Sequence, residues 1–564
     1  MAQAGGVPTA IDDFVKFKSV RNKVMAKKRT PKKKPQVLNN KAKPAAAKLK
    51  RPEFSESKIV KELYEHAKLA FKTKHDQIAV HSLKKALQLD PVHPESMALQ
   101  AILMRRYAKT NKQKNYAVTL MQGACYQDNE QKGWLHLLAR WHVEGNDMIA
   151  ALSALQRVVL LDPNENAALM QIAGLYGSLG YDEESIYYTR QALKKNPVLT
   201  SLCKKERKLS LVVLMTATSD LLKLDQKSFS TRIQEGHNNL ASLLDRSHIT
   251  VRRVYVDNFM HDSSFIEEIK GADVVYNSIT DADRCQDALK QANNVCHRLG
   301  KPVVNSPDAV LGTTRASNHQ RFLGHNTVIL PKSIKVDGVK GSCRKAIREL
   351  LAGKEFVLPV IVRIAGFQGG KHMHMVEDID NHDFSELDAL IQDTPKTLYV
   401  IQYHDVSYTD ERVPDHRLYP KYRAFLVDGK LYPAHLFVTL DDFNVRRVKS
   451  NEVFAKYDWL NDEQNAYLDN PASCFPDGVW QTLEDSMRDV GLDYLGIDFA
   501  NGREAADKGK LVVFEANASM RNMIFDKKPG DPVYESYASV NRAVHEMLCR
   551  VSGIEQWDFD FPHE

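Results

Sequence analysis

The chain lacks the usual features of secreted, zinc-binding and membrane-spanning proteins. Its seven cysteines are scattered and none stands in a CxxC pair, which gives no support for a zinc ribbon or a CxxC redox motif. No stretch approaches the roughly 20 apolar residues of a membrane span. Without an apolar leader segment we expect neither a secretory signal nor a membrane partner. An odd cysteine count in such a chain is typical of reduced thiols, so we expect a cytoplasmic protein.

The motifs of enzymes that use a side-chain nucleophile are also missing. There is no Gly-x-Ser-x-Gly sequence and no nucleophile triad stands out. The glycines around residues 366–370 have the spacing of neither a Walker phosphate loop nor a dinucleotide-binding GxGxxG.

Acidic residues are absent from residues 14–52, while residues 16–51 hold 15 Lys and Arg. The whole chain has a net charge of +7, so the remainder carries −8 and the basic balance is a property of this tail. Interleaved Ala and Pro predict a disordered arm over residues 1–54. The arm could bind RNA, ribosomes or an acidic protein, and is the one segment where nucleic-acid binding is expected. A solubilising leader without a partner is an equal alternative.

Residues 60–199 carry a repeated helical pattern. Asp162-Pro163 and Asn196-Pro197 end two similar segments whose prolines are 34 residues apart, and Leu89-Asp90-Pro91 ends another. Small residues recur at matching offsets before these prolines: Ala67, Ala79 and Ala86; Ala139, Ala151 and Val158; Ala173, Ser185 and Ala192; and, in a degenerate copy, Ala117 and Ala124. The pattern is similar to tetratricopeptide repeats, about four of which would stack into a curved solenoid that binds a peptide or protein. A generic helical bundle is the alternative.

Two apolar strand-like runs near the C-terminus carry oxygen-bearing side chains. Asp498 lies in the first run, and Glu515 and Asn517 end the second. Residues two apart on a strand share a face, so three oxygen ligands converge if the runs are neighbours. Mg²⁺ prefers such ligands together with substrate phosphates. Strands with polar residues on a wet face explain the spacing equally well.

Other segments precede these runs in a fixed order. A strand over 356–363 leads to the glycine cluster, an apolar run ends at residues 402–405, and a hairpin follows over 422–432 with Asp428-Gly429 at its turn. Glycines between extended segments let the backbone amides approach an anion. This order resembles the ATP-grasp superfamily, most closely the ligase branch of glutathione synthetase and the ribosomal-protein glutamate ligases, over residues 205–550.

The upstream segment fits a parallel α/β domain. Strands are expected over 211–215, 251–256, 273–276 and 302–305, and helices over 231–244, 282–299 and 318–323. The family has such a domain before its ATP-binding part. It also has a lysine near the connection, where this chain offers Arg315 and Arg321 without a basis for choosing between them.

The resemblance implies roles for individual residues. The residue before the glycine loop would face the ATP phosphates, and it is Arg363 here in place of the usual lysine. Backbone contacts to adenine would come from the hinge Gln402, Tyr403 and His404, and Asp405 would reach the ribose. The following residues would cover the phosphates: Gly366, Gly369, Gly370 and Lys371.

The same resemblance makes Asp498, Glu515 and Asn517 the Mg²⁺ ligands, with two ions expected and Mn²⁺ able to replace them. Arg423 matches the arginine of the family's Asp-x-Arg strand, but the acid of that pattern is Lys421 here. Arg521 would lie near the reacting carboxylate or acyl phosphate.

The resemblance therefore implies an ATP- and Mg²⁺-dependent carboxylate–amine ligase that works through an acyl phosphate. The expected fold is multidomain, an α-solenoid followed by α/β pre-ATP-grasp and α+β ATP-grasp domains. Its expected boundaries are a basic tail over 1–54, repeats over 55–203, the two α/β parts over 204–308 and 309–552, and a C-terminal tail over 553–564. A small-molecule kinase, and a repeat scaffold with an inactive or ATP-sensing domain, remain alternatives.

Two further groups have two interpretations each. His372 and His374 alternate on a strand, where surface residues are favoured over phosphate contacts. Arg446, Arg447 and Lys449 form a basic cluster, for which a solvated loop is favoured over a clamp on an anionic substrate.

Overall fold

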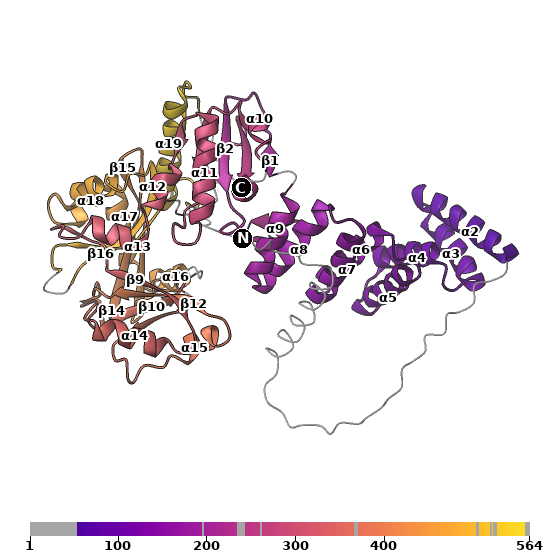
Figure 1. Cartoon of the computed structure of the whole chain (residues 1–564), viewed down its shortest axis with the longest axis horizontal. Coiled ribbons are helices and arrows are strands. Elements are labelled where there is room, and N and C mark those ends of the chain that lie inside the picture. Colours follow the sequence, from indigo (N-terminus) through magenta and orange to yellow (C-terminus); the bar gives the residue numbers. More distant parts are fainter. Residues whose placement is uncertain are drawn as a thin grey trace, which may run out of the picture. The chain divides into compact units, whose positions relative to one another are not determined.

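The computed structural model describes residues 54–194, 197–233, 243–259, 262–365, 370, 372–503, 507–518, 520, 522 and 527–558. The basic tail lies outside these residues, as do Gly366, Gly369, Lys371 and Arg521. The chain divides into two compact units, which are described separately: residues 1–192 with 221–234, and residues 193–220 with 235–564 (Figure 1).

The first unit consists of antiparallel helix pairs that follow one another along the chain. The pairs are α2 (Phe54–Lys72) with α3 (Asp76–Leu89), α4 (Pro94–Tyr107) with α5 (Asn111–Gln127), α6 (Lys132–Glu144) with α7 (Met148–Leu161), and α8 (Asn166–Leu179) with α9 (Asp182–Ala192). Helices α3 and α7 end two residues before Pro91 and Pro163, as the sequence predicts. The expected helical repeat region is therefore present.

The small residues of the sequence pattern lie where the helices meet. Every one of them is buried, with side chains from 0% to 2% exposed: Ala67, Ala79, Ala86, Ala117, Ala124, Ala139, Ala151, Val158, Ala173, Ser185 and Ala192. Because a small side chain lets two helix backbones approach closely, the pattern reports the spacing of the helices directly.

A short hairpin completes this unit. Strands β3 (Leu222–Leu224) and β4 (Thr231–Ile233) pair with each other, and β3 packs on α8. A Cβ atom at Gly177 would lie 2.0 Å from the Leu222 carbonyl oxygen, so glycine is required there. The expected helix over 231–244 is wrong at its start, because the β-branched Thr231 and Ile233 pair with β3; residues 234–242 lie outside the described residues.

The second unit begins with a mostly parallel sheet of order β1-β5-β2-β6-β7. Its strands are β1 (Val198–Ser201), β2 (Leu209–Met215), β5 (Ile249–Tyr255), β6 (Val274–Asn277) and β7 (Val303–Val304). Strands β5, β2, β6 and β7 run parallel, and β1 is antiparallel to β5. The associated helices are α10 (Ile266–Ile269), α11 (Gln286–Leu299) and α12 (Pro307–Leu311). The predicted parallel α/β pattern is confirmed.

A four-stranded antiparallel sheet of order β11-β10-β12-β9 follows. Its strands are β9 (Ser333–Val339), β10 (Val360–Ile364), β11 (Met373–Val376) and β12 (Lys396–Gln402). One face packs on α14 (Cys343–Ala352) and α15 (Ser385–Ile391), which share its apolar core. Strand β10 begins at Val360, later than expected, because Pro359 has no N–H to donate to a ladder.

A six-stranded sheet contains the acidic strands. Its strands are β8 (Val328–Ile329), β13 (Tyr408–Asp410), β14 (Val413–Val427), β15 (Lys430–Leu440), β16 (Tyr494–Asn501) and β17 (Leu511–Asn517). The order is β13-β14-β16-β17-β8, with β15 also paired to β14. Its helices are α16 (Arg447–Lys456), α17 (Trp459–Asp469), α18 (Val479–Arg488) and α19 (Pro532–Ser552), while α13 (Arg315–Arg321) packs on β9.

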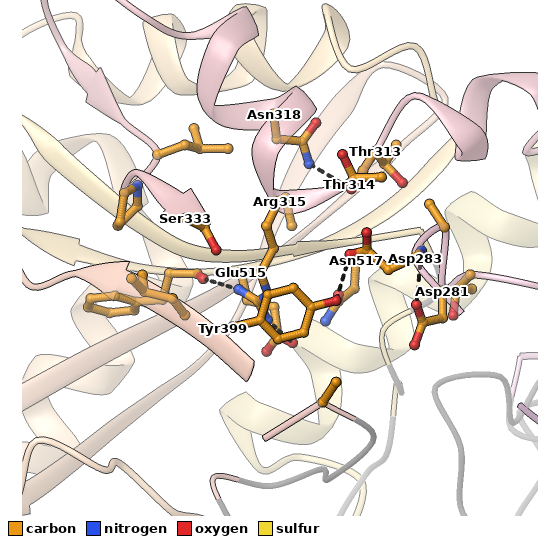
Figure 2. A pocket seen from close by; sticks show the side chains of 18 of the residues that line it. Asp281, Asp283, Thr313, Thr314, Arg315, Asn318, Ser333, Tyr399, Glu515 and Asn517 are labelled. Atoms are coloured by element: carbon orange, nitrogen blue, oxygen red, sulfur yellow. Dashed lines mark hydrogen bonds and ion pairs between the residues drawn. The ribbon is translucent and has the colours of Figure 1, made fainter. Parts of the chain in front are cut away.

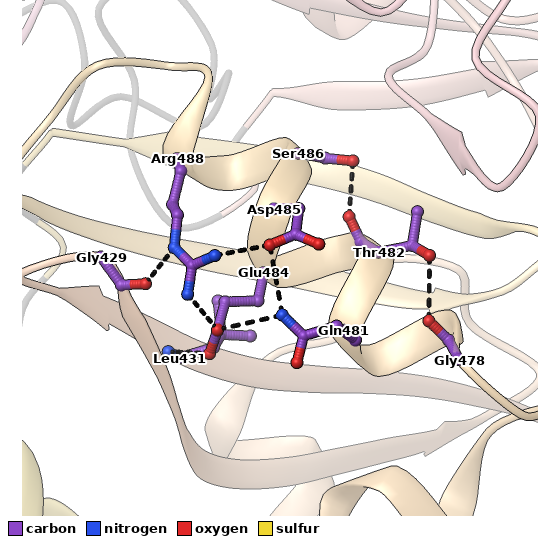
Figure 3. A network of polar contacts seen from close by, with 9 residues as sticks. All are labelled: Gly429, Leu431, Gly478, Gln481, Thr482, Glu484, Asp485, Ser486 and Arg488. Carbon is purple, nitrogen blue, oxygen red and sulfur yellow. Dashed lines mark hydrogen bonds and ion pairs between the residues drawn. The ribbon is translucent and has the colours of Figure 1, made fainter.

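The turn between β14 and β15 is the predicted two-residue hairpin. Asp428 and Gly429 both have positive φ, at 50° and 77°, as a type I′ turn demands. Arg488 of α18 donates to the Gly429 carbonyl at 2.5 Å, and Glu484 accepts from the Leu431 amide at 2.8 Å (Figure 3). These contacts tie the hairpin to the helix.

None of the helices in the described part of the chain has the length and apolarity needed to cross a membrane.

Candidate functional site

A cavity of about 800 Å³ is lined by the four-stranded and the six-stranded sheet of the second unit. The four-stranded sheet contributes residues from β10, β11 and β12, and the six-stranded sheet contributes residues from β14, β15, β16 and β17. The start of α16 closes part of the lining through Arg447, Val448 and Lys449. Segments that lie far apart in the sequence therefore meet at one space.

Most of the residues singled out from the sequence line this cavity. They are Arg363, Gly370, Gln402, Tyr403, His404, Arg423, Asp498, Glu515 and Asn517. Asp405 is not among the lining residues. Its carboxylate instead accepts hydrogen bonds from the Ser407 amide and hydroxyl and from Arg417, at 2.7–2.9 Å. Gly366, Gly369, Lys371 and Arg521 lie outside the described residues.

The segment Gln402–His404 at the end of β12 lines the cavity and is fixed by side-chain and backbone contacts. Gln402 donates to the Val357 carbonyl at 2.9 Å and accepts from the Val357 amide at 3.2 Å. His404 lies 2.7 Å from a carboxylate oxygen of Asp507. The backbone amides of Gln402 and Tyr403 donate to the Lys332 and Pro359 carbonyls at 2.8 and 3.4 Å, and the Tyr403 carbonyl accepts from Gln402 Nε2 at 3.3 Å. The adenine-binding role of this segment therefore stays a prediction.

Asp498 is held by two cations. Its oxygens accept from Arg423 Nε at 2.8 Å and Nη2 at 2.9 Å, and Lys421 Nζ lies 3.1 Å from the second oxygen. Asp498 is 2% exposed. Burial alone would raise the pKa of Asp498, but Arg423 and Lys421 outweigh it and hold that pKa well below its usual range. The carboxylate is ionised at all ordinary pH values.

Glu515 lies opposite Asp498 on the neighbouring strand. Its Oε1 atom is 3.6 Å from Arg315 Nη2, and Arg315 also donates to the Phe514 carbonyl at 3.3 Å. Burial lowers the pKa of Arg363, as does the nearby charge of Arg315, while Glu515 raises it. Two arginines therefore flank one carboxylate at this end of the cavity.

Asn517 completes the oxygen-bearing group. It pairs in register with Gly496, two positions along the ladder from Asp498. Its Nδ2 atom is buried and has no hydrogen-bond partner among the residues that the structure describes. An unsatisfied buried amide facing a cavity is a place where a ligand or an ion's hydration shell fits. Within the described part of the chain there is no group of three His, Cys, Asp or Glu arranged to hold a metal ion.

Glu515 and Asn517 fit Mg²⁺ better than Asp498 does. A carboxylate and an amide oxygen, completed by phosphate oxygens and water, is a normal Mg²⁺ environment. Both oxygens of Asp498 are occupied by the Arg423 guanidinium. The expected convergence of three oxygen-bearing side chains on adjacent strands is present, but one of the three is neutralised in this arrangement.

A second cavity of about 130 Å³ lies against the same residues (Figure 2). It shares Arg315, Arg363, Glu515 and Asn517 with the large cavity. Its other polar lining residues are Asp281, Asp283, Arg284, Thr280, Thr313, Thr314, Asn318, Ser333 and Tyr399. Tyr399 donates to Asp283 at 2.8 Å, which ties the four-stranded sheet to the loop after β6.

Sequence reasoning left Arg315 and Arg321 undecided, and the structure separates them. Arg315 lines both cavities. Arg321 donates to Asn318 at 2.7 Å and to the Gly312 carbonyl at 3.3 Å, and is not among the lining residues of either cavity. The two lie on α13, a helix that the sequence predicted to begin three residues later.

The basic cluster and the histidine pair have different outcomes. Arg446, Arg447 and Lys449 all line the large cavity, while Arg446 and Lys449 are exposed and Lys449 pairs with Asp442, so the clamp on an anionic substrate stays a prediction. His372 and His374 do not line it; they pair with Glu386, at 2.6 and 3.4 Å. No sequence signal distinguished these groups, because both are charged residues beside a predicted strand or loop.

No protein-family model and no curated protein matches the chain. Among solved structures, it is similar to carboxyaminoimidazole ribonucleotide synthase from Aspergillus clavatus complexed with ATP, at 10% identity and a TM-score of 0.33, covering 59% of this chain and 77% of that one. It is also similar to MamA (20% identity, TM-score 0.22, 24% and 77% covered) and to YrrB, a tetratricopeptide repeat protein (19%, 0.22, 25% and 75%). All three scores are low.

Proposed function

We propose that this chain is an ATP- and Mg²⁺-dependent carboxylate–amine ligase of the ATP-grasp type. The observation that carries the proposal is the large cavity, which brings Gln402–His404, Arg363, Arg423, Glu515 and Asn517 to one space lined by two sheets. These segments are spread over more than 150 residues of sequence. The α/β part over 204–308 and the ATP-binding part over 309–552 would together form the enzyme.

In this proposal the adenine lies against the hinge, where Ile361, Ile401 and Val512 supply apolar surface. The triphosphate extends toward Arg363 and Arg315, and Gly366, Gly369, Gly370 and Lys371 cover it. Gly370 has φ of 66°, and its carbonyl accepts from Asn444 at 2.8 Å, so the end of this loop is already anchored at the cavity. A bidentate guanidinium suits phosphate oxygens as well as the family's lysine does.

Mg²⁺ would be held by Glu515 and Asn517 together with phosphate oxygens, with Asp498 beside them as the third oxygen group. When bound, the ion neutralises charge on the transferring phosphoryl group. The residues of the chain orient the reactants: Arg363 and Arg315 hold the phosphates, and Arg423 and Arg521 hold the acyl group.

The reaction then needs no enzyme nucleophile. A carboxylate oxygen of the substrate attacks the γ-phosphorus and ADP leaves, which gives an acyl phosphate. The amine nitrogen attacks the acyl carbon, inorganic phosphate leaves and the nitrogen loses a proton. Positioning and charge stabilisation supply the rate enhancement, and the helical repeats would recruit a peptide or protein that carries one of the substrates.

The test is nucleotide turnover by the full chain with candidate carboxylates and amines. ADP and phosphate released only when both are present support the ligase. Phosphate transferred to a hydroxyl acceptor would replace it with a small-molecule kinase. Absence of Mg-ATP binding in calorimetry would rule out both enzymes.

One observation favours a second candidate, a repeat scaffold whose nucleotide domain senses ATP without turning it over. Lys421 stands where the family has an acid, and with Arg423 it neutralises Asp498. Mg-ATP binding without turnover in the presence of any carboxylate and amine pair would select this candidate.

A further inference from the structure

Asn305 fastens the parallel sheet of the second unit to the two strands that carry the acidic residues. It follows β7 directly and its side chain is 0% exposed. The Oδ1 atom accepts from the Tyr494 amide at 2.9 Å, and the Nδ2 atom donates to the Tyr494 carbonyl at 2.8 Å. Nδ2 also donates to the Ala518 carbonyl. Both N–H groups and the carbonyl oxygen of this buried amide are therefore hydrogen-bonded.

The backbone at residue 305 is fixed by the same neighbouring segment. Its φ of 54° lies in the left-handed region, where asparagine is favoured among residues other than glycine. Its amide donates to a carboxylate oxygen of Asp493, directly before β16, at 2.8 Å. The main chain and the side chain of Asn305 thus contact the start of β16 together.

The hydrogen bonds of Asn305 lie at the point where β16 and β17 stop pairing. The ladder between these strands ends with the pair Gly496 and Asn517. Tyr494 lies two residues before Gly496, and Ala518 follows Asn517 directly. The side-chain amide of Asn305 therefore joins the two strands just past the ladder, in the way that the peptide group of a further pair would. The main chain of Asn517 is held by Gly496 on one side and by Asn305 on the other.

A second contact holds the same segment. The Tyr494 hydroxyl donates to the Met520 carbonyl at 3.0 Å, and both residues are buried. A Cβ atom at Gly496 would lie 2.0 Å from the Met520 Cβ, so glycine is required where Met520 packs on β16. The chain after Asn517 is therefore closely packed on β16, and Asn305 ties this packed segment to the parallel sheet.

The end of β17 is where small displacements matter most for a metal ion. Mg²⁺ demands near-ideal octahedral geometry, with oxygen atoms at about 2.0–2.1 Å. Residues that orient metal ligands from behind typically contribute about 10–100-fold to metal affinity. Glu515 and Asn517 are two residues apart on β17, so a shift of the main chain at Ala518 would move both.

We propose that Asn305 is a positioning residue of the Mg²⁺ site: its side-chain amide fixes the end of β17 and so sets the directions of Glu515 and Asn517. The inference rests on the proposed function for the presence of Mg²⁺ with a nucleotide. The hydrogen bonds themselves join the α/β part of the chain to the strand that would hold the ion, which makes the parallel sheet a part of the metal site's support.

The experiment measures how much Mg²⁺ the full chain needs to bind a nucleotide. The non-hydrolysable AMP-PNP is titrated by calorimetry at a series of Mg²⁺ concentrations, which gives the concentration at which nucleotide affinity is half maximal. Asn305→Gly keeps the backbone conformation and removes the amide. We expect it to raise that Mg²⁺ concentration by about tenfold, with an unchanged number of binding sites per folded chain.

Asn277→Ala is the matched control. Asn277 ends β6 in the same parallel sheet and is also 0% exposed. Its side-chain amide bonds within its own loop, accepting from the Ile279 amide at 3.1 Å and donating to the Ile279 carbonyl at 3.4 Å. Its loss should lower the melting temperature and leave the Mg²⁺ requirement as in the unmodified chain.

A milder variant covers the case in which Asn305→Gly does not fold. Asp493 is partly exposed, and Asp493→Ala removes only the hydrogen bond to the Asn305 amide. We expect the Mg²⁺ requirement to rise by about threefold, less than one whole hydrogen bond would give. An unchanged requirement in this variant would then overturn the inference.

A folded Asn305→Gly that binds AMP-PNP with an unchanged Mg²⁺ requirement would overturn the inference, because Asn305 would then serve stability alone. An equal rise in Asn277→Ala would do the same. Nucleotide binding by the unmodified chain that does not depend on Mg²⁺, or no binding at all, would overturn both the inference and the proposed function. Failure of the ligase alone looks different: no carboxylate and amine pair would be turned over, while the Asn305-dependent Mg²⁺ requirement would persist.

Discussion

The helical repeats and the ATP-binding part of this chain are stabilised in different ways. In the repeats, small apolar residues recur at a fixed spacing, and each is buried against a neighbouring helix. In the sheets around the large cavity, buried charges such as Asp498 and Arg423 come from strands 75 residues apart. The first arrangement is made of many similar small contacts, whereas the second depends on a few pairs of charges.

The largest effect should come from breaking the buried pair. Asp498→Asn leaves Arg423 and Lys421 without their counter-charge, so we expect the second unit to lose about 3–5 kcal/mol of unfolding free energy. Asp410 provides a matched control, since it also accepts two hydrogen bonds from one arginine, Arg412, but on the surface. Asp410→Asn should cost no more than about 1 kcal/mol in urea unfolding. Similar losses for the two variants would contradict the comparison.

Replacing a buried carboxylate that has no counter-charge should raise the unfolding free energy, where replacing Asp498 lowers it. Burial raises the pKa of Asp220 to about 7, and Asp257 adds to this. The folded pKa exceeds the unfolded value of about 3.9, so the contribution of Asp220 to stability is complete below pH 4 and is lost as the pH rises through 7. Asp220→Asn should therefore stabilise the chain at pH 8 by about 2–4 kcal/mol, with little change at pH 4. Thermal unfolding across this range tests the sign, and equal effects at both pH values would refute it.

Turnover at the site should also be separable from the stability of the fold. Glu515→Gln removes the carboxylate proposed to hold Mg²⁺ while its contact with Arg315, at 3.6 Å and partly exposed, is weak. We expect turnover to fall by about 100-fold or more with an unchanged melting temperature. The control is Glu411→Gln on an exposed turn. Undiminished turnover would show that Glu515 holds no catalytic ion.

The smallest effect concerns the repeats. Gly177→Ala places a Cβ 2.0 Å from the Leu222 carbonyl, so the hairpin must shift, at a cost of about 1–3 kcal/mol. Gly133→Ala on α6 meets nothing within 4 Å and should stabilise its helix by about 0.5–1 kcal/mol. A lower melting temperature for Gly177→Ala and a higher one for Gly133→Ala would confirm that close packing, and not glycine content, limits the stability of this unit.

Much of the architecture could be predicted because its signals are local. The proline spacing, the small residues of the repeats and the Asp428-Gly429 turn each depend on residues close together in the sequence. The two apolar runs that carry Asp498 and Glu515 were also predicted as strands, whereas their adjacency was only a condition that the structure meets. The helix expected over 231–244 failed at its start because pairing with β3, a non-local contact, decides the conformation of Thr231.

The details of the site could not be predicted because they depend on which charges meet. Nothing in the sequence said that Lys421 would join Arg423 on Asp498, that Arg315 would face the cavity while Arg321 would not, or that the start of α16 would line the same space. Each of these outcomes is set by the register of β14 against β16, or by the direction of one helix turn.

The hairpin β3–β4 has a consequence for dividing this protein into fragments. Residues up to 192 belong to the first unit, and residues 193–220, with β1 and β2, belong to the second. Residues 221–234 belong to the first unit again, and all later residues belong to the second. A fragment that stops at residue 192 is therefore missing the strand that covers Gly174 and Gly177, and it presents a bare helix face to water. The two units alternate along the sequence, so no single cut, whether by a protease or by a cloning boundary, separates them with both units whole.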